Sequence, residues 1–264
     1  MLHPMKNTLY ALIKWSVLLL IFLSISNALL YYFTSPKQNK DWITEHAVLP
    51  NILIQPNVKN PKVMVNNIRD FKWSTENMAH YKNLEFHLEN IVELKAVVSH
   101  FSAISEIAHV FMIFVLDDGQ ELGVSIEARR EANEAFSIQG GLLAQFEIMY
   151  VLATPQDLLG IRKINGDTVH IYPIKETKEK AQELFLLIAS EVNALYKEPA
   201  LYHLLFKNCT NQLVKNVSIL TEQKYPWYFQ TIAPGLTGNT LYKLDLIDLP
   251  HLSYDEIQVK TRIQ

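Results

Sequence analysis

The chain has 264 residues, of which 49% are hydrophobic and 19% are charged, and its formal net charge is −3. This balance gives no electrostatic footprint for nucleic acid, so we expect no nucleic-acid partner. Once an N-terminal segment is set aside, roughly 220 residues remain, which is enough for one well-buried domain.

The first predicted element is a membrane-spanning helix. Trp15 to Phe33 form a nearly unbroken apolar run, close to the roughly 20 residues that cross a bilayer. Lys6 and Lys14 precede the run, which favours an N-terminus on the cytoplasmic side. We therefore expect residues 1–14 in the cytoplasm and a single-pass anchor at residues 15–34.

The alternative for this segment is a cleaved signal peptide. Ser26-Asn27-Ala28 has the small residues of a cleavage site. The apolar and aromatic residues 29–33 directly after it favour an uncleaved anchor. With either reading, we expect the body of the protein to work outside the cytoplasmic membrane.

The body begins with a linker and then a series of strands. Residues 35–62 hold four prolines and no sustained periodicity, which predicts a linker that wraps around the domain. The strands are predicted, in chain order, within 63–75, within 84–99, and at His109–Leu116, Glu121–Arg129, Phe146–Ala153 and Thr168–Ile174. The His109–Leu116 segment is apolar on both parities, as in a strand buried on both faces.

Helices follow the strands. Apolar residues recur at helical spacing through Lys175–Lys197, and Asn208 is a good N-cap for a helix from about Cys209 to Leu220. Another short helix is predicted near Leu241. Strands first and helices later predict an α+β fold, an antiparallel sheet with helices packed on it, over residues 63–264.

Cys209 is the only cysteine in the chain. The free N–H groups at the start of a helix lower the pKa of a thiol and can also hold an oxyanion. These properties make Cys209 a candidate nucleophile. The alternative is a small core residue, because free cysteine is among the most buried residue types.

A cysteine nucleophile needs a base and a group that orients the base. His109 opens the strongest predicted strand and is therefore well held. His203, six residues before Cys209, is a second candidate. The alternative role for His109 is a hydrogen-bonded histidine at the end of a sheet.

The register of one hairpin decides which residue orients His109. With a two-residue turn at Asp118-Gly119, His109 lies opposite Ala128. With a three-residue turn at residues 117–119, His109 lies opposite Glu127 instead. The sequence leaves both registers open.

Two further groups of charges have competing interpretations. Arg129 and Arg130 stand between Glu127 and Glu131, either as a solvated face or as a site for anionic head groups or phosphate. Asp157 and Arg162 are predicted to form a structural pair. The chain has no HExxH, Walker A, GxGxxG or GxSxG motif, so we expect no metal and no cofactor, and no serine α/β-hydrolase.

Several segments together resemble the DUF4105 family, also called the Lnb N-terminal periplasmic domain. The matching segments are Asn67-Ile68-Arg69-Asp70-Phe71, Ala108-His109-Val110-Phe111, residues 125–131 (SIEARRE), Tyr150-Val151 with Asp157 and Arg162, Tyr172-Pro173, and Asn208-Cys209-Thr210 behind Tyr202. The resemblance covers roughly residues 60 to 250. It implies a circularly permuted papain-like fold of the NlpC/P60 type, in the periplasm of a bacterium and anchored in its inner membrane.

The resemblance also implies a site. Cys209 is the implied nucleophile and His109 the base. From the hairpin register, Glu127 or a neighbouring polar group is the candidate that orients His109. Further candidates for contact with substrate or oxyanion are Ser125, Arg129, Arg130, Asn208 and Tyr202. The implied activity is acyl transfer or hydrolysis on lipid or lipoprotein substrates. Two alternatives are an amidase or peptidase that acts on peptidoglycan and a non-catalytic binding module of the cell envelope.

Overall fold

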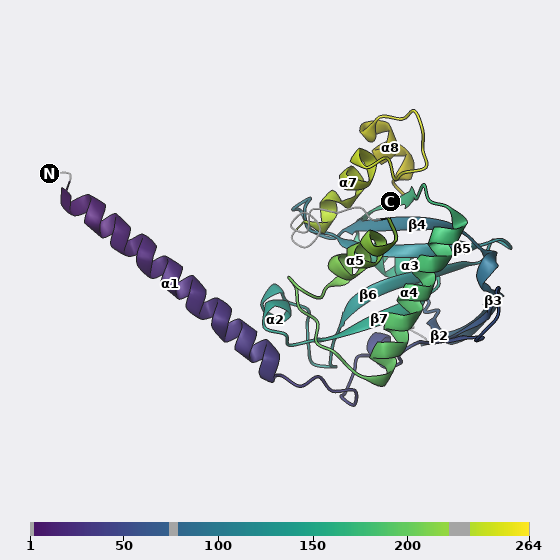
Figure 1. Cartoon of the computed structure of the whole chain (residues 1–264), viewed down its shortest axis with the longest axis horizontal. Coiled ribbons are helices and arrows are strands. Elements are labelled where there is room, and N and C mark those ends of the chain that lie inside the picture. The colour runs from purple at the N-terminus through teal and green to yellow at the C-terminus, as the bar shows by residue number, and fades with distance from the viewer. Residues whose placement is uncertain (1–2, 74–78, 222–232, 264) are drawn as a thin grey trace.

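The computed structural model describes residues 3–73, 79–221 and 233–263. Its helices are α1 (His3–Phe33), η1 (Thr44–His46), η2 (Leu88–Asn90), α2 (Ile138–Leu142), α3 (Pro155–Asn165), α4 (Lys178–Lys197), α5 (Cys209–Thr221), η3 (Pro234–Leu236), α7 (Thr237–Lys243) and α8 (Tyr254–Thr261). Helix α1 extends away from a compact mixed domain (Figure 1).

The domain is built on one eight-stranded sheet. Its strands are β1 (Asn51–Ile54), β2 (Lys62–Arg69), β3 (Tyr81–His87), β4 (Ile91–His100), β5 (His109–Leu116), β6 (Glu121–Arg129), β7 (Glu147–Ala153) and β8 (Thr168–Pro173). They lie in the order β1-β2-β7-β6-β5-β4-β8, with β3 beside β2. The pairs are antiparallel except β2 with β7. The predicted α+β class is confirmed; the permuted papain-like arrangement stays a prediction.

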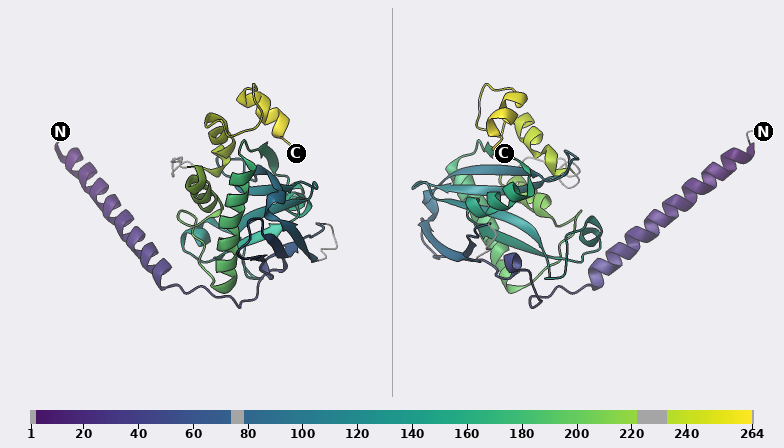
Figure 2. Two further views of the ribbon diagram at one scale, coloured as in Figure 1. Left: turned by 45° about the vertical axis from the view of Figure 1, so that its right-hand side comes forward. Right: turned by 180° about the vertical axis from the view of Figure 1, so that it is seen from behind.

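Helices cover both faces of the sheet. Helices α4 and α5 lie on one face and α3 lies on the other, as the front and back views show (Figures 1 and 2). Helix α4 forms because Leu184, Ile188 and Val192 repeat at four-residue spacing and are all buried. Thr177 begins it by accepting a hydrogen bond from the Lys180 N–H. The two resulting cores flank the central strands β5 and β6.

The β5–β6 hairpin takes the three-residue register. Met112 pairs with Val124 and Ile113 with Gly123. Gly119 closes the turn with a φ of 83°, a left-handed value that glycine adopts without strain. Continued to the start of β5, this register sets His109 opposite Glu127. The alternative register, which would set Ala128 there, is wrong.

The remaining differences from the predicted elements concern short segments. The predicted linker at residues 35–62 contains η1 and the whole of β1, which pairs with β2. Four residues with mixed polarity carry too weak a period to be recognised alone. Helix α7 fulfils the prediction near Leu241, and α8 follows it without having been predicted.

Helix α1 contains the predicted membrane-spanning segment. Leu12–Leu30 is long and apolar enough to cross a bilayer, with a mean hydropathy of 1.9, and none of its residues is fully buried. Among the described part of the chain, no other helix meets this test. The exposed apolar surface of α1 is the surface that lipid would cover.

Candidate active site

Cys209 is the first residue of α5. The side-chain oxygen of Asn208 accepts hydrogen bonds from the N–H groups of Thr210 and Asn211, both at 2.9 Å. The Asn208 N–H in turn donates to the side-chain oxygen of Asn211 at 2.7 Å. This reciprocal cap fixes the start of the helix, as predicted for Asn208. It also holds the partly buried thiol in place at the helix N-terminus.

His109 belongs to a hydrogen-bonded chain of three side chains. Its Nε2 lies 2.7 Å from the Ser125 hydroxyl oxygen and 3.2 Å from Oε1 of Glu127. The Ser125 hydroxyl donates to the same Glu127 oxygen at 2.7 Å. Because Ser125 uses its only hydrogen on Glu127, its oxygen is the acceptor and Nε2 of His109 is the donor. The other ring nitrogen, Nδ1, takes part in neither contact.

The Cys209 thiol and the His109 ring interact directly. Burial raises the pKa of Cys209, but the positive charge of His109 and a hydrogen bond to its ring outweigh burial and lower it. Burial lowers the pKa of His109. The negative charges of Glu127 and Cys209 outweigh burial and raise that pKa to about 9. Each group therefore stabilises the charged form of the other.

Glu127 is the anionic end of this chain. Burial raises its pKa, yet His109 and Arg162 together hold that pKa well below the ordinary value. Nη2 of Arg162, on α3, lies 3.3 Å from Oε1 of Glu127. The carboxylate is therefore shared between a histidine and an arginine that reach it from different elements.

The predicted Asp157–Arg162 pair is wrong, because each residue has another partner. Asp157 is fully buried. Both of its carboxylate oxygens accept hydrogen bonds from the Arg69 guanidinium, the shortest at 2.8 Å. It also accepts the Phe71 N–H and the Trp73 indole N–H. Asp157 thus ties β2 to α3, while Arg162 is left for Glu127.

Tyr202 lies close to the thiol. Burial raises the pKa of its phenol, and the negative charges of Cys209 and Glu127 raise that pKa further. The phenol therefore stays protonated throughout the physiological range and keeps a proton to donate. Its backbone N–H is fixed to the Phe146 carbonyl at 2.9 Å. The role of Tyr202 as a donor to an oxyanion stays a prediction.

Arg129 does not take the predicted head-group role. Its guanidinium is buried and donates to the His46 carbonyl, the Gln38 side chain and the Ala47 carbonyl at 3.0, 3.0 and 3.3 Å. It also lies 4.0 Å over the ring of Trp42. The prediction fails because these partners occupy the donors that a phosphate would need.

Arg130 contacts the protein through its backbone, and the head-group role of its side chain stays a prediction. The Arg130 backbone N–H donates to Nδ1 of His46 at 2.9 Å. Residues 129 and 130 therefore hold the wrapping segment against the sheet.

His203, the alternative base, accepts the Leu205 N–H at Nδ1, and its Nε2 lies 3.1 Å from the side-chain oxygen of Asn27. Both of its ring nitrogens have partners within the protein, and the choice of His109 as the base stays a prediction.

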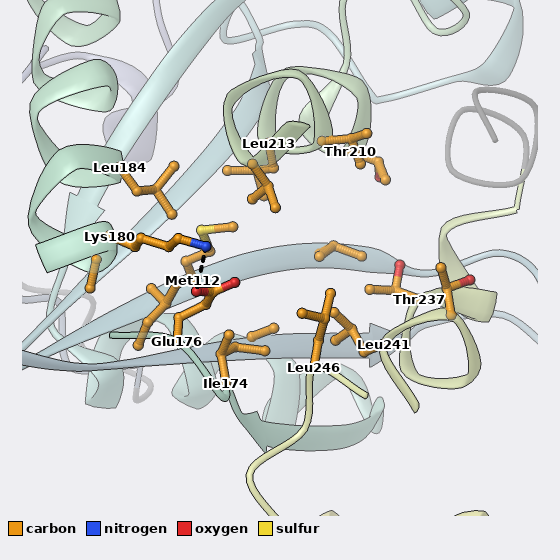
Figure 3. Close-up of a pocket in the computed structure, with 17 residues that line it drawn as sticks. Met112, Ile174, Glu176, Lys180, Leu184, Thr210, Leu213, Thr237, Leu241 and Leu246 are labelled. Carbon is orange, nitrogen blue, oxygen red and sulfur yellow. Dashed lines mark ion pairs between the residues drawn. The ribbon is translucent and has the colours of Figure 1, made fainter. Parts of the chain in front are cut away.

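An apolar pocket adjoins the thiol between the sheet, α4, α5 and α7. Its cavity volume is about 100 Å³. Figure 3 shows aliphatic side chains along its length, among them Met112, Leu184, Leu213, Leu241 and Leu246. The sequence did not reveal this pocket, because its walls come from segments far apart in the chain.

The two ends of the pocket differ in chemistry. Glu176 and Lys180 form an ion pair of 3.3 Å at one end, and Thr210 lies at the other (Figure 3). The Thr210 hydroxyl is 3.5 Å from the sulfur of Cys209. One residue therefore lines the pocket and touches the nucleophile candidate. Within the described residues, no cluster of three or more His, Cys, Asp or Glu is placed to hold a metal ion.

Together these features define an α+β domain with a buried thiol–imidazole–carboxylate arrangement behind an N-terminal apolar helix. The chain belongs to the family of the Lnb N-terminal periplasmic domain, whose model matches residues 78–235, more than half of the chain. No curated protein and no solved structure matches it. A periplasmic domain family and one apolar N-terminal helix are consistent with a single-pass membrane protein.

Proposed function

We propose that this protein is a membrane-anchored cysteine enzyme that transfers or hydrolyses acyl groups of lipid or lipoprotein substrates. The observation that carries the proposal is the position of Thr210, which joins the Cys209 thiol to the apolar pocket. An acyl chain in that pocket would bring its carboxyl end toward the sulfur. Aliphatic walls suit such a chain, since burial of each methylene group is worth about 0.8 kcal/mol.

The first half of the proposed reaction forms a thioester. The Cys209 thiolate attacks the carbonyl carbon of an ester or amide, and its electron pair forms the new S–C bond. The carbonyl oxygen becomes an oxyanion, for which the Cys209 N–H and the Tyr202 hydroxyl are the candidate donors. When the tetrahedral intermediate collapses, the C–O or C–N bond breaks, and the leaving alcohol or amine takes the proton from His109.

The second half returns the enzyme to its starting state. Water or an acceptor amine attacks the thioester carbonyl and gives a proton to His109. The S–C bond breaks and the sulfur leaves as a thiolate, beside a histidine that is again protonated. Glu127 stabilises the imidazolium and holds the ring through its contact with Nε2.

The test is a mass measurement on the full chain in nanodiscs. We expect a diacylated lipopeptide to leave an acyl mass on the peptide that contains Cys209, and hydroxylamine to remove it as it cleaves thioesters. A Cys209→Ala variant serves as the control and should gain no mass. The cap residues Asn208 and Asn211 are unchanged in both proteins, so the start of α5 stays intact.

Muropeptides in the same assay distinguish the peptidoglycan alternative. Cys209-dependent cleavage of a muropeptide, with no acyl adduct from the lipopeptide, would replace our proposal by an amidase or peptidase. A Cys209 thiol that reacts with iodoacetamide no faster than free cysteine would instead favour the non-catalytic binding module.

A further inference from the structure

Helix α1 is hydrogen-bonded to the domain beside the candidate site. Asn27 donates from its side-chain nitrogen to the Leu142 carbonyl at 2.5 Å, and its oxygen lies 3.1 Å from Nε2 of His203. The end of α1 lies next to α2 in all views (Figures 1 and 2). Asn27 is partly buried, so these two bonds mark the face of α1 that meets the domain.

The position of Asn27 along α1 places this contact near a membrane boundary. The apolar window of α1 ends at Leu30, three residues after Asn27, or about 4.5 Å along the helix axis. Leu142 and His203 therefore lie level with the last turn of the apolar segment. If α1 crosses a bilayer, the parts of the domain that hold these residues lie at the lipid surface.

Those same parts carry large apolar side chains that face solvent. They are Phe136, Ile138, Leu143, Leu205 and Phe206, and we call them the apolar rim. Phe206 is 74% exposed, Ile138 57% and Leu143 50%. A soluble surface seldom gathers several such side chains in one place.

The two segments of the apolar rim form one unit. The Leu204 N–H bonds to the Gly141 carbonyl at 2.9 Å, which ties the 203–207 turn to α2. His203 and Lys207 close that turn by a backbone bridge. The ring of His203 is tilted against that of Phe206, with 4.6 Å between the ring centroids. The exposed tip of the turn is therefore fixed directly beside the residue that α1 contacts.

A third apolar segment continues this surface along the same end of the sheet's strands. Phe101 and Ile104, which are 51% and 56% exposed, lie in the loop between β4 and β5. That loop and the β6–β7 connection, which holds α2, leave the sheet at the same end of its strands, because β4 and β6 run in the same direction. His109 begins β5 at this end.

We propose that the apolar rim inserts into the lipid leaflet at the end of the membrane helix, so that the domain docks its Cys209 edge on the bilayer. The occupant is lipid because the rim is hydrogen-bonded to α1 itself, the element that lipid surrounds. Phe, Leu and Ile at the level of the head groups are the side chains that anchor surface segments in a membrane. The turn that holds Phe206 leads directly to Asn208 and Cys209.

The docking is tested in nanodiscs with the full chain. Phe206→Cys and Ile138→Cys are each made in a Cys209→Ser background and labelled with an environment-sensitive fluorophore. Val259→Cys is the matched control, because Val259 is also exposed, at 80%, and lies on the distant helix α8. We expect lipids with a nitroxide near the start of the acyl chain to quench residues 206 and 138 several-fold more than residue 259.

Two results would overturn the docking. Equal quenching at residues 206, 138 and 259 would show that the apolar rim lies in water. A blue-shifted emission at residues 206 and 138 without nitroxide quenching would show that protein, such as a second copy of the chain, covers the rim. Neither readout requires a reactive thiol, so the test stands apart from the proposed acyl chemistry.

Discussion

Oε1 of Glu127 lies 3.2 Å from Nε2 of His109, on neighbouring strands whose register is fixed by a three-residue turn. The carboxylate reaches one side of the imidazole ring, and the Cys209 thiol interacts with the ring as well. The negative charges of both groups raise the pKa of His109. This arrangement explains why its pKa is high although the ring is buried.

Replacing His109 with alanine should make the thiol slow to react. The variant loses the charge and hydrogen bond that lower the Cys209 pKa, while burial, which raises it, remains. We expect the rate of alkylation by iodoacetamide at pH 7 to fall roughly tenfold or more. Mass spectrometry of the Cys209 peptide follows the rate. His100→Ala, at the end of β4, is the control and should leave it unchanged.

The pH dependence of stability follows from the same pair. The folded-state pKa of His109, about 9, exceeds its ordinary value of 6.5. Protonated His109 therefore stabilises the fold fully below about pH 6.5, and this contribution is lost as the pH rises through 9. We expect thermal unfolding in detergent to shift to lower temperature between pH 7 and 10 in the wild type. The shift should be smaller in His109→Ala; an equal shift would contradict the assignment.

A Glu127→Gln variant should lower the thiolate fraction of Cys209 near neutral pH. The substitution keeps the size of the side chain but removes a charge that raises the His109 pKa. The imidazolium then loses its proton at lower pH, and the thiolate loses its stabilising partner there. Alkylation rates measured from pH 6 to 10 would show this decrease near neutral pH. Glu121→Gln, on the same strand but paired with Lys95, should keep the wild-type profile.

Filling the apolar pocket should change selectivity for chain length. Leu241 is a partly buried residue of the pocket wall, on α7. Leu241→Trp would occupy space that a long acyl chain needs, so we expect the acyl adduct from long-chain donors to decrease and that from short-chain donors to persist. Tyr242→Trp, the exposed neighbour, is the control. Equal losses for both chain lengths would argue against the pocket as the acyl site.

The buried pair that joins β2 to α3 should be important for stability. Asp157 is fully buried and accepts bonds from Arg69, Phe71 and Trp73. Asp157→Asn leaves the Arg69 charge without its partner, and we expect the free energy of unfolding to fall by about 3–5 kcal/mol. Denaturant titration measures the change. Glu85→Gln, which removes an exposed ion pair with Lys62, should cost about 0–1 kcal/mol.

Local patterns in the sequence predicted the elements that hold the candidate nucleophile and base. Continuous apolarity predicted β5, helical spacing predicted α4, and Asn208 predicted the start of α5. Each of these signals acts within a few residues, so it can be recognised without knowledge of the fold. The short strand β1 escaped recognition, because its four residues depend on pairing with β2.

The sequence by itself determined that the chain has one apolar N-terminal helix, an α+β body and a single cysteine behind a helix cap. Only the tertiary structure decided which residues meet. A one-residue choice of register placed Glu127 at His109, Arg162 joined Glu127 and not Asp157, and Arg129 was used to hold the wrapping segment. Contacts between distant segments depend on the packing of the whole sheet and its helices, and no local period encodes them.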